Sequence, residues 1–517
     1  MSTVDGRRLS WIRLSLLLGA VIALVFVAMS GWRVFQDTQA AARGGQAFVG
    51  YVDATVTPLE EFEEPVSDAA GHVALSFVVA SPDDVCQPAW GGAYTLDDAA
   101  RDLDLDRRIA RLRQQDGSVM VSFGGAINSE LATTCEDPAQ LLAAYGDVVD
   151  RYDLQAIDLD IEGAALTDVA ANARRAVAIQ ALQESRPEDE PLEVWLTLPV
   201  APTGLTDEGR AAVSSMLDAG VDLAGVNVMT MDFGGARAEG QSMIDATTDA
   251  LEATHDQLGT LYAGSGIDLG PATVWKRMGA TPMIGQNDVA GEVFTLADAR
   301  ALSAFAADKG LARLSLWSLN RDRTCGANYP DVKTVSNACS GVAQGGTSFA
   351  TILAGGVAGP TGTPTPTPEE TASAAPASLA DDPATSPYPI WSVDGTYVEG
   401  TRIVWHRNAY VAKWWTLGDV PDDPVVDEAS SPWRLIGPVL PGETPIVQPT
   451  VPTGTYPAWV ETTVYHRGER VMLDGLAFTA KWWTQGTSPD ALSTPAKPSP
   501  WRQLTDPEVR KVLAAEG

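Results

Sequence analysis

The chain has 517 residues, of which 45% are hydrophobic and 20% charged, and its formal net charge is −32. The length allows more than one domain, and the composition is that of an ordinary globular protein. So negative a surface repels nucleic acid and anionic membranes and disfavours acidic polymers as substrates. We therefore expect no nucleic-acid partner. The charge does not argue against a neutral polymer as the ligand.

The first residues of the chain predict export. A basic stretch containing Arg7, Arg8 and Arg13 precedes the apolar run at 14–29, as in a signal peptide. With the tryptophans at its two ends included, the run reaches the roughly 20 residues that span a membrane. Residues 1–45 are therefore expected to be a signal peptide or, as we prefer, an uncleaved membrane anchor with a stalk. Both interpretations place the remaining chain outside the membrane.

The four cysteines agree with export, because disulfides persist outside the cytoplasm. Three pairings are possible. We expect Cys325–Cys339, which would close a short loop, and Cys86–Cys135. The chain has no Cys-x-x-Cys pair and only four scattered histidines, so we expect no metal and no cofactor.

Composition divides the rest of the chain into three zones. Residues 46–345 have a mixed, globular composition. Residues 355–387 are rich in Pro, Thr, Ala and Gly, with TPTPTP at their centre, and the segment 346–387 is expected to be an extended, semi-rigid linker. From Tyr388 onward the chain is rich in tryptophan.

The tryptophan-rich zone is an internal repeat. The motif AKWWT stands at 412–416 and again at 480–484. Seven residues recur with the same spacing of 68: Trp391, Tyr397, Gly400, Lys413, Trp414, Trp415 and Trp433 correspond to Trp459, Tyr465, Gly468, Lys481, Trp482, Trp483 and Trp501. The repeat predicts two small all-β modules at 388–437 and 456–505.

The zone 46–345 alternates between strand and helix patterns, as in an α/β fold. The candidate strands are 47–53, 73–79, 118–125, 154–162, 192–199, 224–232, 281–288 and 311–319. Amphipathic stretches such as Asp97–Gln115, Pro138–Tyr152 and Leu296–Lys309 lie between them. Eight such units predict a (β/α)₈ TIM barrel. The alternative, an open doubly wound sheet, lacks a glycine-rich phosphate fingerprint.

The densest chemical signal is Asp158-Leu159-Asp160-Ile161-Glu162. Side chains alternate along a strand, so the three carboxylates share one face. Crowded acids raise one another's pKa, which keeps one member protonated as a general acid requires. Glu162 comes last and is nearest the end of the barrel where catalysis takes place. A solvated edge strand or a set of calcium ligands is the alternative, and the apolar flanks argue against it.

Four motifs in this zone resemble those of glycoside hydrolase family 18, the chitinase family. The fourth-strand motif D-x-x-D-x-D-x-E corresponds to QAIDLDIE at 155–162, and the third-strand S-x-G-G to SFGG at 122–125. The sixth-strand M-x-Y-D corresponds to MTMD at 229–232, and the eighth-strand tryptophan to Trp317.

The resemblance implies a mechanism. Glu162 would protonate the glycosidic oxygen, and the N-acetyl group of the substrate would act as the nucleophile, with net retention. Asp160 would orient that acetamido group, and Asp158 would share a proton with Asp160. Ser122 and the glycines of SFGG would only pack beneath the acids.

Further residues would bind the reacting sugar. Asp232 would contact it from the sixth strand, with Met229 and Met231 of the same motif, and Trp317 would form the floor of its subsite. Two positions depart from the family pattern: Gln155 replaces an Asp deep in the barrel, and Met231 replaces a Tyr that binds the acetamido carbonyl. Both departures are expected to change the rate rather than abolish activity.

The repeats resemble carbohydrate-binding modules of families 5 and 12, which bind chitin and cellulose. The candidate sugar-stacking side chains are Trp391, Trp414, Trp415, Trp459, Trp482 and Trp483. Trp433 and Trp501 are expected in the module cores.

The resemblances together imply an extracellular, monomeric chitinase that hydrolyses β-1,4-linked N-acetylglucosamine polymers, with chitin or chitooligosaccharides as partners. An endo-β-N-acetylglucosaminidase acting on glycans and a non-catalytic chitin-binding surface lectin are the alternatives.

Overall fold

The computed structural model describes residues 46–65, 67–326, 335–357, 381–423, 430–446, 450–491, 499–504 and 506–516. The predicted export segment at 1–45 lies outside these residues. Within them, no helix has both the length and the apolar character needed to cross a membrane. Contacts divide the chain into two compact units. The first holds the described residues up to Leu96 and those from 117 to 357, and the second holds Asp97–Asp116 and the described residues from 381 onward.

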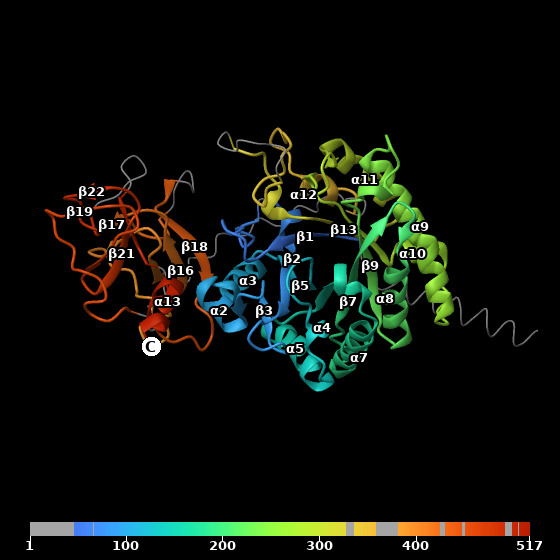
Figure 1. The fold of residues 1–517 in the computed structure, drawn as a ribbon, viewed down its shortest axis with the longest axis horizontal. Helices are drawn as coiled ribbons and strands as arrows, with labels where there is room; N and C mark the ends of the chain where they lie inside the picture. Colours follow the sequence, from blue (N-terminus) through green and yellow to red (C-terminus); the bar gives the residue numbers. More distant parts are fainter. Residues whose placement is uncertain are drawn as a thin grey trace, which may run out of the picture. The chain divides into compact units, whose positions relative to one another are not determined.

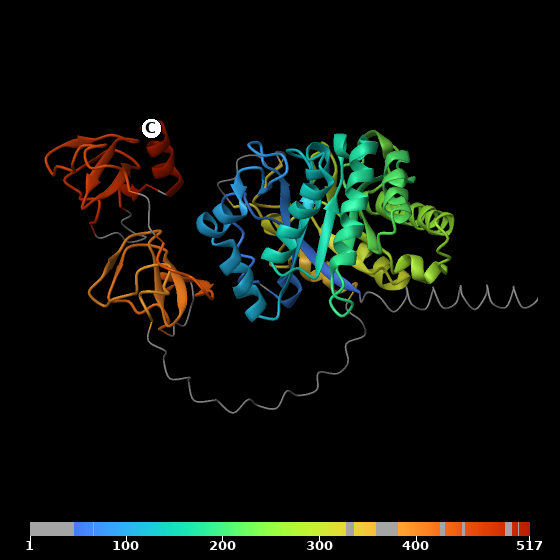
Figure 2. The same ribbon diagram turned by 90° about the horizontal axis from the view of Figure 1, so that it is seen from below.

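The first unit is built on a closed barrel of parallel strands (Figures 1 and 2). Strand β1 pairs with both β2 and β13, which closes the sheet. The barrel strands are β1 (Ala47–Asp53), β2 (His72–Ala80), β5 (Ser118–Gly124), β6 (Ala156–Asp160), β7 (Glu193–Ala201), β9 (Leu223–Met229), β10 (Met278–Thr281) and β13 (Arg313–Leu316). The predicted (β/α)₈ TIM barrel is therefore confirmed.

Helices connect successive strands and lie outside the barrel, as α5, α7, α8 and α9 show in Figures 1 and 2. The helices of the first unit are α4 (Leu131–Thr134), α5 (Pro138–Arg151), α6 (Gly163–Thr167), α7 (Val169–Ser185), α8 (Asp207–Asp218), α9 (Met243–Gly264), α10 (Pro271–Trp275), α11 (Leu296–Lys309) and α12 (Phe349–Ala354). The contacts assign α2 (Leu96–Asp102), all but its first residue, and α3 (Leu105–Gln114) to the second unit. Helix α11 has the predicted bounds because Thr295 and Asp298 form a capping box at its start and Gly310 ends it.

Several predicted bounds differ from the structure, and three of the differences concern a whole element. The helix expected at Asp97–Gln115 is divided into α2 and α3 at Asp104, which has a φ of 51°. The seventh strand, expected at 281–288, is β10 at Met278–Thr281, since Pro282 has no N–H for a strand ladder. The linker was expected to begin at 346, but residues 349–354 form α12, whose Phe349 is fully buried.

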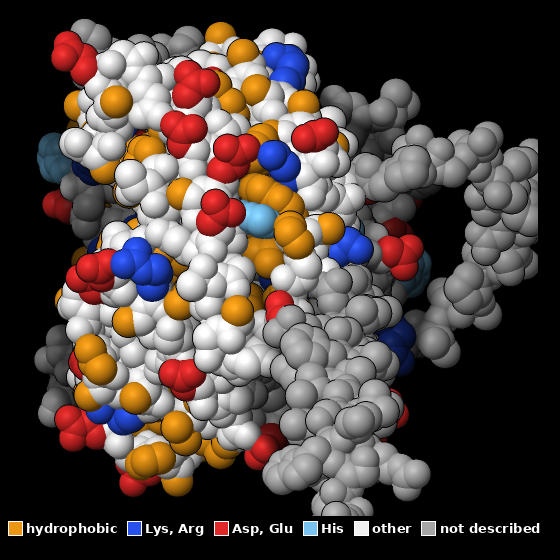
Figure 3. All heavy atoms as spheres, turned by 90° about the vertical axis from the view of Figure 1, so that its right-hand side faces the viewer, with side chains coloured by type: hydrophobic (Ala, Val, Ile, Leu, Met, Phe, Trp, Pro, Cys, Tyr) orange, Lys and Arg blue, Asp and Glu red, His pale blue; other side chains and the backbone are white. Residues whose placement is uncertain are grey.

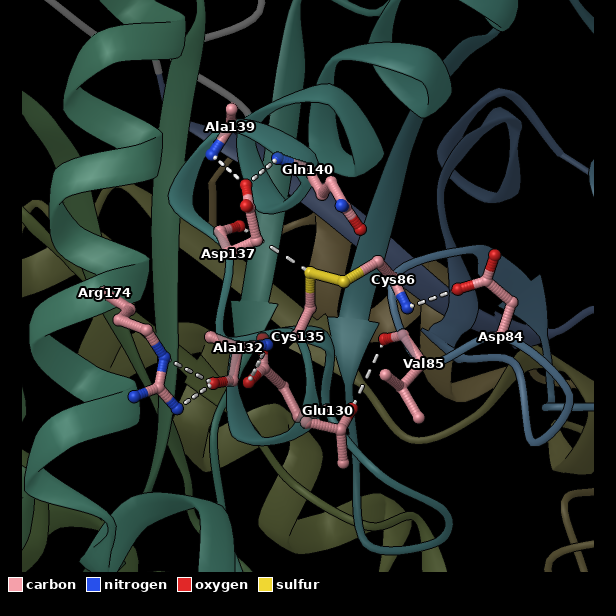
Figure 4. Close-up of a disulfide and its surroundings, with 11 residues drawn as sticks. Asp84, Val85, Cys86, Glu130, Ala132, Cys135, Asp137, Ala139, Gln140 and Arg174 are labelled. Carbon is pink, nitrogen blue, oxygen red and sulfur yellow. Dashed lines mark hydrogen bonds between the residues drawn. A yellow bond between two sulfur atoms is a disulfide. The ribbon is translucent and has the colours of Figure 1, made fainter.

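Both expected disulfides are present. Cys86 joins Cys135 across 49 residues, and Cys325 joins Cys339 across 14. Figure 4 shows the first bond between the loop before β3 (Pro88–Trp90) and the end of α4. Arg174 of α7 donates to the Ala132 carbonyl of α4 at 2.7 Å, so this short helix is held from two sides.

The second unit contains the two predicted modules. Module 1 has β14 (Thr396–Tyr397) paired with β17 (Thr416–Leu417), and a sheet of β15 (Arg402–Trp405), β16 (Asn408–Ala412) and β18 (Trp433–Pro438). Module 2 repeats this with β19 (Val464–Tyr465), β22 (Thr484–Gln485), β20 (Arg470–Leu473), β21 (Leu476–Ala480) and β23 (Trp501–Gln503). The sequence repeat is thus a repeat of structure.

The two module cores use equivalent positions. The core of module 1 is Tyr397, Ile403, Tyr410, Ala412 and Trp433, and that of module 2 is Tyr465, Val471, Phe478, Ala480 and Trp501. Trp433 and Trp501 are 2% and 3% exposed, which confirms their expected core role. A helix that the sequence pattern did not predict, α13 (Asp506–Glu516), packs Val509 against Leu504 beside module 2.

Figure 3 shows one face of the molecule in space-filling form. Its acidic side chains are spread among apolar and cationic ones. On this face the net negative charge forms no single acidic patch, so it acts as a general solubilising charge there.

Candidate active site

The carboxyl ends of three barrel strands carry the predicted site. Asp158 and Asp160 lie in β6, and Glu162 follows the end of that strand. Asp232 follows the end of β9, and Trp317 follows the end of β13. Since parallel barrel strands end on the same face, these side chains lie around one mouth.

Asp158 is completely buried and accepts four hydrogen bonds from four strands. Tyr51 Oη and Ser122 Oγ donate to its Oδ2 at 2.9 and 2.7 Å. Thr197 Oγ1 and Arg313 Nη1 donate to its Oδ1 at 2.7 and 3.1 Å. Ser122 therefore binds an acid directly, and its expected role as packing alone was wrong.

A further ring of polar side chains supports these donors. Asn227 Nδ2 donates to Thr197 Oγ1 at 3.0 Å and to Thr281 Oγ1 at 2.7 Å. Sequence reasoning missed Tyr51, Thr197, Asn227 and Arg313. The sequence did contain a pattern that could have identified them. Each is a polar residue in a mainly apolar strand, at a position whose side chain points into the barrel, and a buried polar side chain there needs a hydrogen-bond partner.

Asp160 lies above Asp158 and is 5% exposed, and its Oδ1 has no hydrogen-bond partner. Burial raises its pKa well above the usual range, the charges of Glu162 and Asp158 raise it further, and Arg313 lowers it. The expected proton-sharing bond between Asp158 and Asp160 is absent from the described residues. Asp160 is thus a buried acid with a raised pKa, and its Oδ1 is buried without a hydrogen-bond partner within the described residues.

Glu162 is half-buried at the start of α6. Burial raises its pKa to about 7, and the nearby charge of Asp232 contributes to the rise. A carboxyl group with this pKa holds its proton near neutral pH and can give it up during a reaction, as a general acid must.

Asp232 is fixed by its own loop. Its backbone has a φ of 48°, and its Oδ1 accepts the Val289 N–H at 2.9 Å. The loop that follows is held by buried Glu292, which accepts the N–H groups of Phe233 and Gly234 at 3.0 and 2.9 Å. Burial raises the pKa of Asp232. The site therefore contains a second carboxyl group in a fixed position beside Glu162.

Trp317 is half-buried. Its ring stacks on Phe77 with centroids 5.4 Å apart and meets the edge of Tyr51 at 6.2 Å. A β-carbon on Gly125 would clash with the Phe77 ring, so the second glycine of SFGG makes room for this stack. Met229 is half-buried, and Met231 is 9% exposed.

Gln155 does not lie deep in the barrel. It precedes β6 and its side chain is exposed, while its carbonyl accepts the Glu193 N–H at 2.9 Å. Because the side chain faces solvent at the start of the strand, this departure from the family motif leaves the acids untouched.

The tryptophans of the modules fall into two groups. Trp482 and Trp483 are 44% and 58% exposed, whereas Trp414 and Trp415 are half-buried. Trp391 and Trp459 pack against the module cores, and their Nε1 atoms are buried without partners. Module 2 therefore presents the more open aromatic pair.

Known proteins share both parts of the chain. The family model Glycosyl hydrolases family 18 matches residues 47–264, and the model Carbohydrate-binding module family 5/12 matches residues 458–502. The chain is 37% identical over 314 residues to "Probable bifunctional chitinase/lysozyme" of Escherichia coli (strain K12) and 36% identical over 308 residues to "Endochitinase 11" of Metarhizium anisopliae. These alignments cover 57% and 56% of this chain but only 34% and 57% of the two relatives.

Among solved structures, the first unit is similar to the catalytic domain of a hyperthermophilic chitinase from Pyrococcus furiosus. The two are 27% identical with a TM-score of 0.50, over 60% of this chain and 95% of that one. The first unit is equally similar, at 27% identity and a TM-score of 0.50, to catalytic-site mutants of active domain 2 of a thermostable chitinase from Pyrococcus furiosus, which were solved in complex with chito-oligosaccharides.

Proposed function

We propose, from the match of residues 47–264 to the family model Glycosyl hydrolases family 18, that the chain is a chitinase. Its substrate is a β-1,4-linked N-acetylglucosamine polymer. The observation that carries the proposal is the pair formed by Glu162, whose pKa is raised to about 7, and the buried Asp160 beside it.

The reaction follows from the acids that the barrel presents. Glu162 protonates the glycosidic oxygen as the bond to the leaving sugar breaks. The acetamido oxygen of the substrate attacks the anomeric carbon and forms an oxazolinium ion, which water opens with net retention. Asp160 donates a hydrogen bond to the acetamido group and holds it for this attack. Trp317 supports the apolar face of the sugar.

The test is product profiling on chitin oligosaccharides with the wild type and Glu162→Gln. We expect a loss of at least about 100-fold in kcat, the size of a general-acid contribution. Glu188→Gln removes an exposed glutamate after α7 and serves as the charge-matched control. Undiminished cleavage by Glu162→Gln would overturn the proposal. Inversion at the anomeric carbon, followed by NMR, would refute the substrate-assisted step alone.

Two further assays address other functions. Release of whole glycans from a glycoprotein, with chitin left intact, would identify an endo-β-N-acetylglucosaminidase. Binding to chitin without any cleavage would identify a lectin. A bacterial cell-wall substrate belongs in the same panel, because the relative from Escherichia coli is described as a probable bifunctional chitinase/lysozyme.

The same proposal gives the modules and the disulfides a role. Module 2 carries the family 5/12 match and an exposed tryptophan pair, and it holds the enzyme on the polymer. The two disulfides support an extracellular location. Fractionation of the producing cells tests the location, and recovery of the protein from the cytoplasm would contradict it.

A further inference from the structure

A cavity of about 180 Å³ lies at the end of the barrel opposite the acids. It is bordered by Leu223, the first residue of β9, and by Arg277, which directly precedes β10. Asp232 of the candidate active site follows the other end of β9, so the two sites lie at opposite ends of the strands. A cavity of about 150 Å³ holds one benzene molecule, and this one is therefore large enough for a small organic ligand.

Most of the cavity wall is apolar. The aliphatic side chains that line it belong to Leu217, Val221, Leu223, Ile267 and Leu269. Asp222 also lines the cavity, and its side chain is 55% exposed, which places the carboxylate where the cavity meets solvent.

Two polar side chains of the wall each have a buried atom without a hydrogen-bond partner among the described residues. These atoms are Tyr262 Oη and Arg277 Nε, in side chains that are 4% and 5% exposed. Unpaired buried polar atoms are costly and rare in native proteins. Arg277 Nη1 donates to the Leu223 carbonyl, so the guanidinium is held in place while its Nε stays unpaired. The cavity therefore offers two hydrogen-bonding groups that the protein itself does not use.

Both groups suit a ligand atom that accepts hydrogen bonds. The Nε of arginine can only donate. Burial raises the pKa of Tyr262 to about 12, so its phenol keeps the proton and can donate it. The charge of Arg277 in turn lowers this pKa, because the two side chains lie near each other. A ligand oxygen with two lone pairs is the complement of such a pair of donors.

The charges around Arg277 favour a neutral acceptor over an anion. Asp222 Oδ1 lies 4.0 Å from Arg277 Nη1. Burial raises the pKa of Glu193 and the charge of Arg277 lowers it, so a second carboxyl group is also near the guanidinium. A third carboxylate would be repelled by these two. A carbonyl oxygen avoids that repulsion, and Asp222 can accept a hydrogen bond from an N–H group of the same ligand.

We propose that this cavity binds an acetamido group, with its carbonyl oxygen bonded to Tyr262 Oη and Arg277 Nε, its methyl group against the aliphatic wall and its N–H directed to Asp222. A secondary amide has one acceptor, one donor and an apolar end, and the cavity presents a complement to each. The inference goes beyond the proposed function and does not depend on it, because the cavity is separate from the acids. The sugars that the proposed reaction releases carry the same group.

A titration of the full-length protein with N-methylacetamide tests the proposal, followed by NMR of ¹³C-labelled isoleucine methyl groups. Ile267 lines the cavity, whereas Ile161, between Asp160 and Glu162, reports separately on the active site. We expect a saturable shift of the Ile267 signal with N-methylacetamide and with N-acetylglucosamine, and none with glucose, which lacks the acetamido group. A shift with N-methylacetamide alone would support the acetamido site and exclude the sugar as its ligand.

Tyr262→Phe removes one of the two donors. It should weaken the binding of N-methylacetamide about tenfold, the effect of one lost hydrogen bond. The Tm without ligand should not fall, because the hydroxyl has no partner among the described residues. Tyr456→Phe is the matched control in module 2, where the hydroxyl accepts a hydrogen bond from Arg470 Nη1 at 2.7 Å, and it should bind as the wild type does. A lower Tm of Tyr262→Phe with unchanged binding would show a structural role and overturn the proposal.

Two outcomes of the wild-type titration would also overturn it. An Ile267 signal that moves with none of the probes would mean that the two buried atoms hold water only. Tighter binding of acetate than of N-methylacetamide would show that the cavity takes an anion. N-methylacetamide has no glycosidic bond, so the titration gives its answer even if the protein cleaves no chitin, and failure of the proposed function is distinguished from failure of this site.

Discussion

The carbonyl oxygen of Asp160 occupies the space in which a β-carbon on Gly124 would lie. Gly124 has a φ of 104°, which L side chains rarely adopt. The next residue, Gly125, donates its N–H to the same oxygen at 3.0 Å. Gly124 at the end of β5 and Gly125 directly after it therefore set the position of the backbone that carries the acids.

Gly124→Ala should damage both stability and catalysis. The added carbon pushes β6 away from β5 and displaces Asp160, so we expect a lower Tm and a loss of at least about tenfold in kcat. Gly266→Ala is the matched control, because Gly266 also has a positive φ, 81°, but open space around it. That control should cost only about 1 kcal/mol of unfolding free energy and leave kcat unchanged. Equal kcat values for the two variants would show that the close approach of Gly124 to the Asp160 carbonyl oxygen does not matter for catalysis.

The pH dependence of cleavage should have its basic limb near the pKa of Glu162. This group is needed in its protonated form, so activity falls as pH rises through about 7. Asp232→Asn removes a negative charge that raises this pKa, and the basic limb should therefore move to lower pH. Profiles of kcat/KM for the wild type, Asp232→Asn and Glu188→Gln give the comparison. An unmoved limb in Asp232→Asn would show that Asp232 does not influence the acid.

Binding to insoluble chitin should depend mainly on Trp482 and Trp483. Each exposed ring offers a flat apolar face, and its replacement by Ala should weaken binding about tenfold, or about 1.4 kcal/mol. Trp414→Ala and Trp415→Ala should have smaller effects, because those rings are half-buried. Sedimentation with chitin measures the bound fraction, and Val460→Ala, at another exposed position of module 2, is the control. Stronger losses from the module 1 variants would reverse this assignment.

The two disulfides should differ in their contribution to stability. In the chain-entropy description, a bond across 49 residues contributes about 4 kcal/mol and one across 14 residues about 3 kcal/mol. Cys86→Ala with Cys135→Ala should therefore lower the free energy of unfolding more than Cys325→Ala with Cys339→Ala does. Urea unfolding of the two double variants measures the difference. The opposite order would mean that loop closure is not the dominant effect.

Local patterns predicted much of the barrel and of the site. The alternation in Asp158-Leu159-Asp160-Ile161-Glu162 identified the acid strand, and the two aspartates lie in β6 as the pattern requires. The repeat predicted the modules, because the same spacing governs the residues that fill each core. The alternating acids and the 68-residue repeat are both periodic patterns, and a periodic pattern can be recognised from the sequence alone.

Other features depend on contacts between distant parts of the chain. Arg313 is 155 residues from Asp158, and only closure of the barrel brings the two together. The position of β10 was missed because the apolar run after Thr281 resembles a strand, whereas the ladder with β9 ends at that residue. Nothing in the sequence distinguishes Trp391 and Trp459 from the exposed tryptophans. The packing in the structure shows that their rings lie against the module cores.

The two small cores are built from equivalent positions, while the tryptophan pairs outside them differ in exposure. In each module, one set of side chains maintains the fold and another is left for recognition. In such a module, the residues that fold it and the residues that bind the ligand can be changed separately. Its recognition surface can be redesigned for another crystalline polysaccharide while the five residues that fold it are kept.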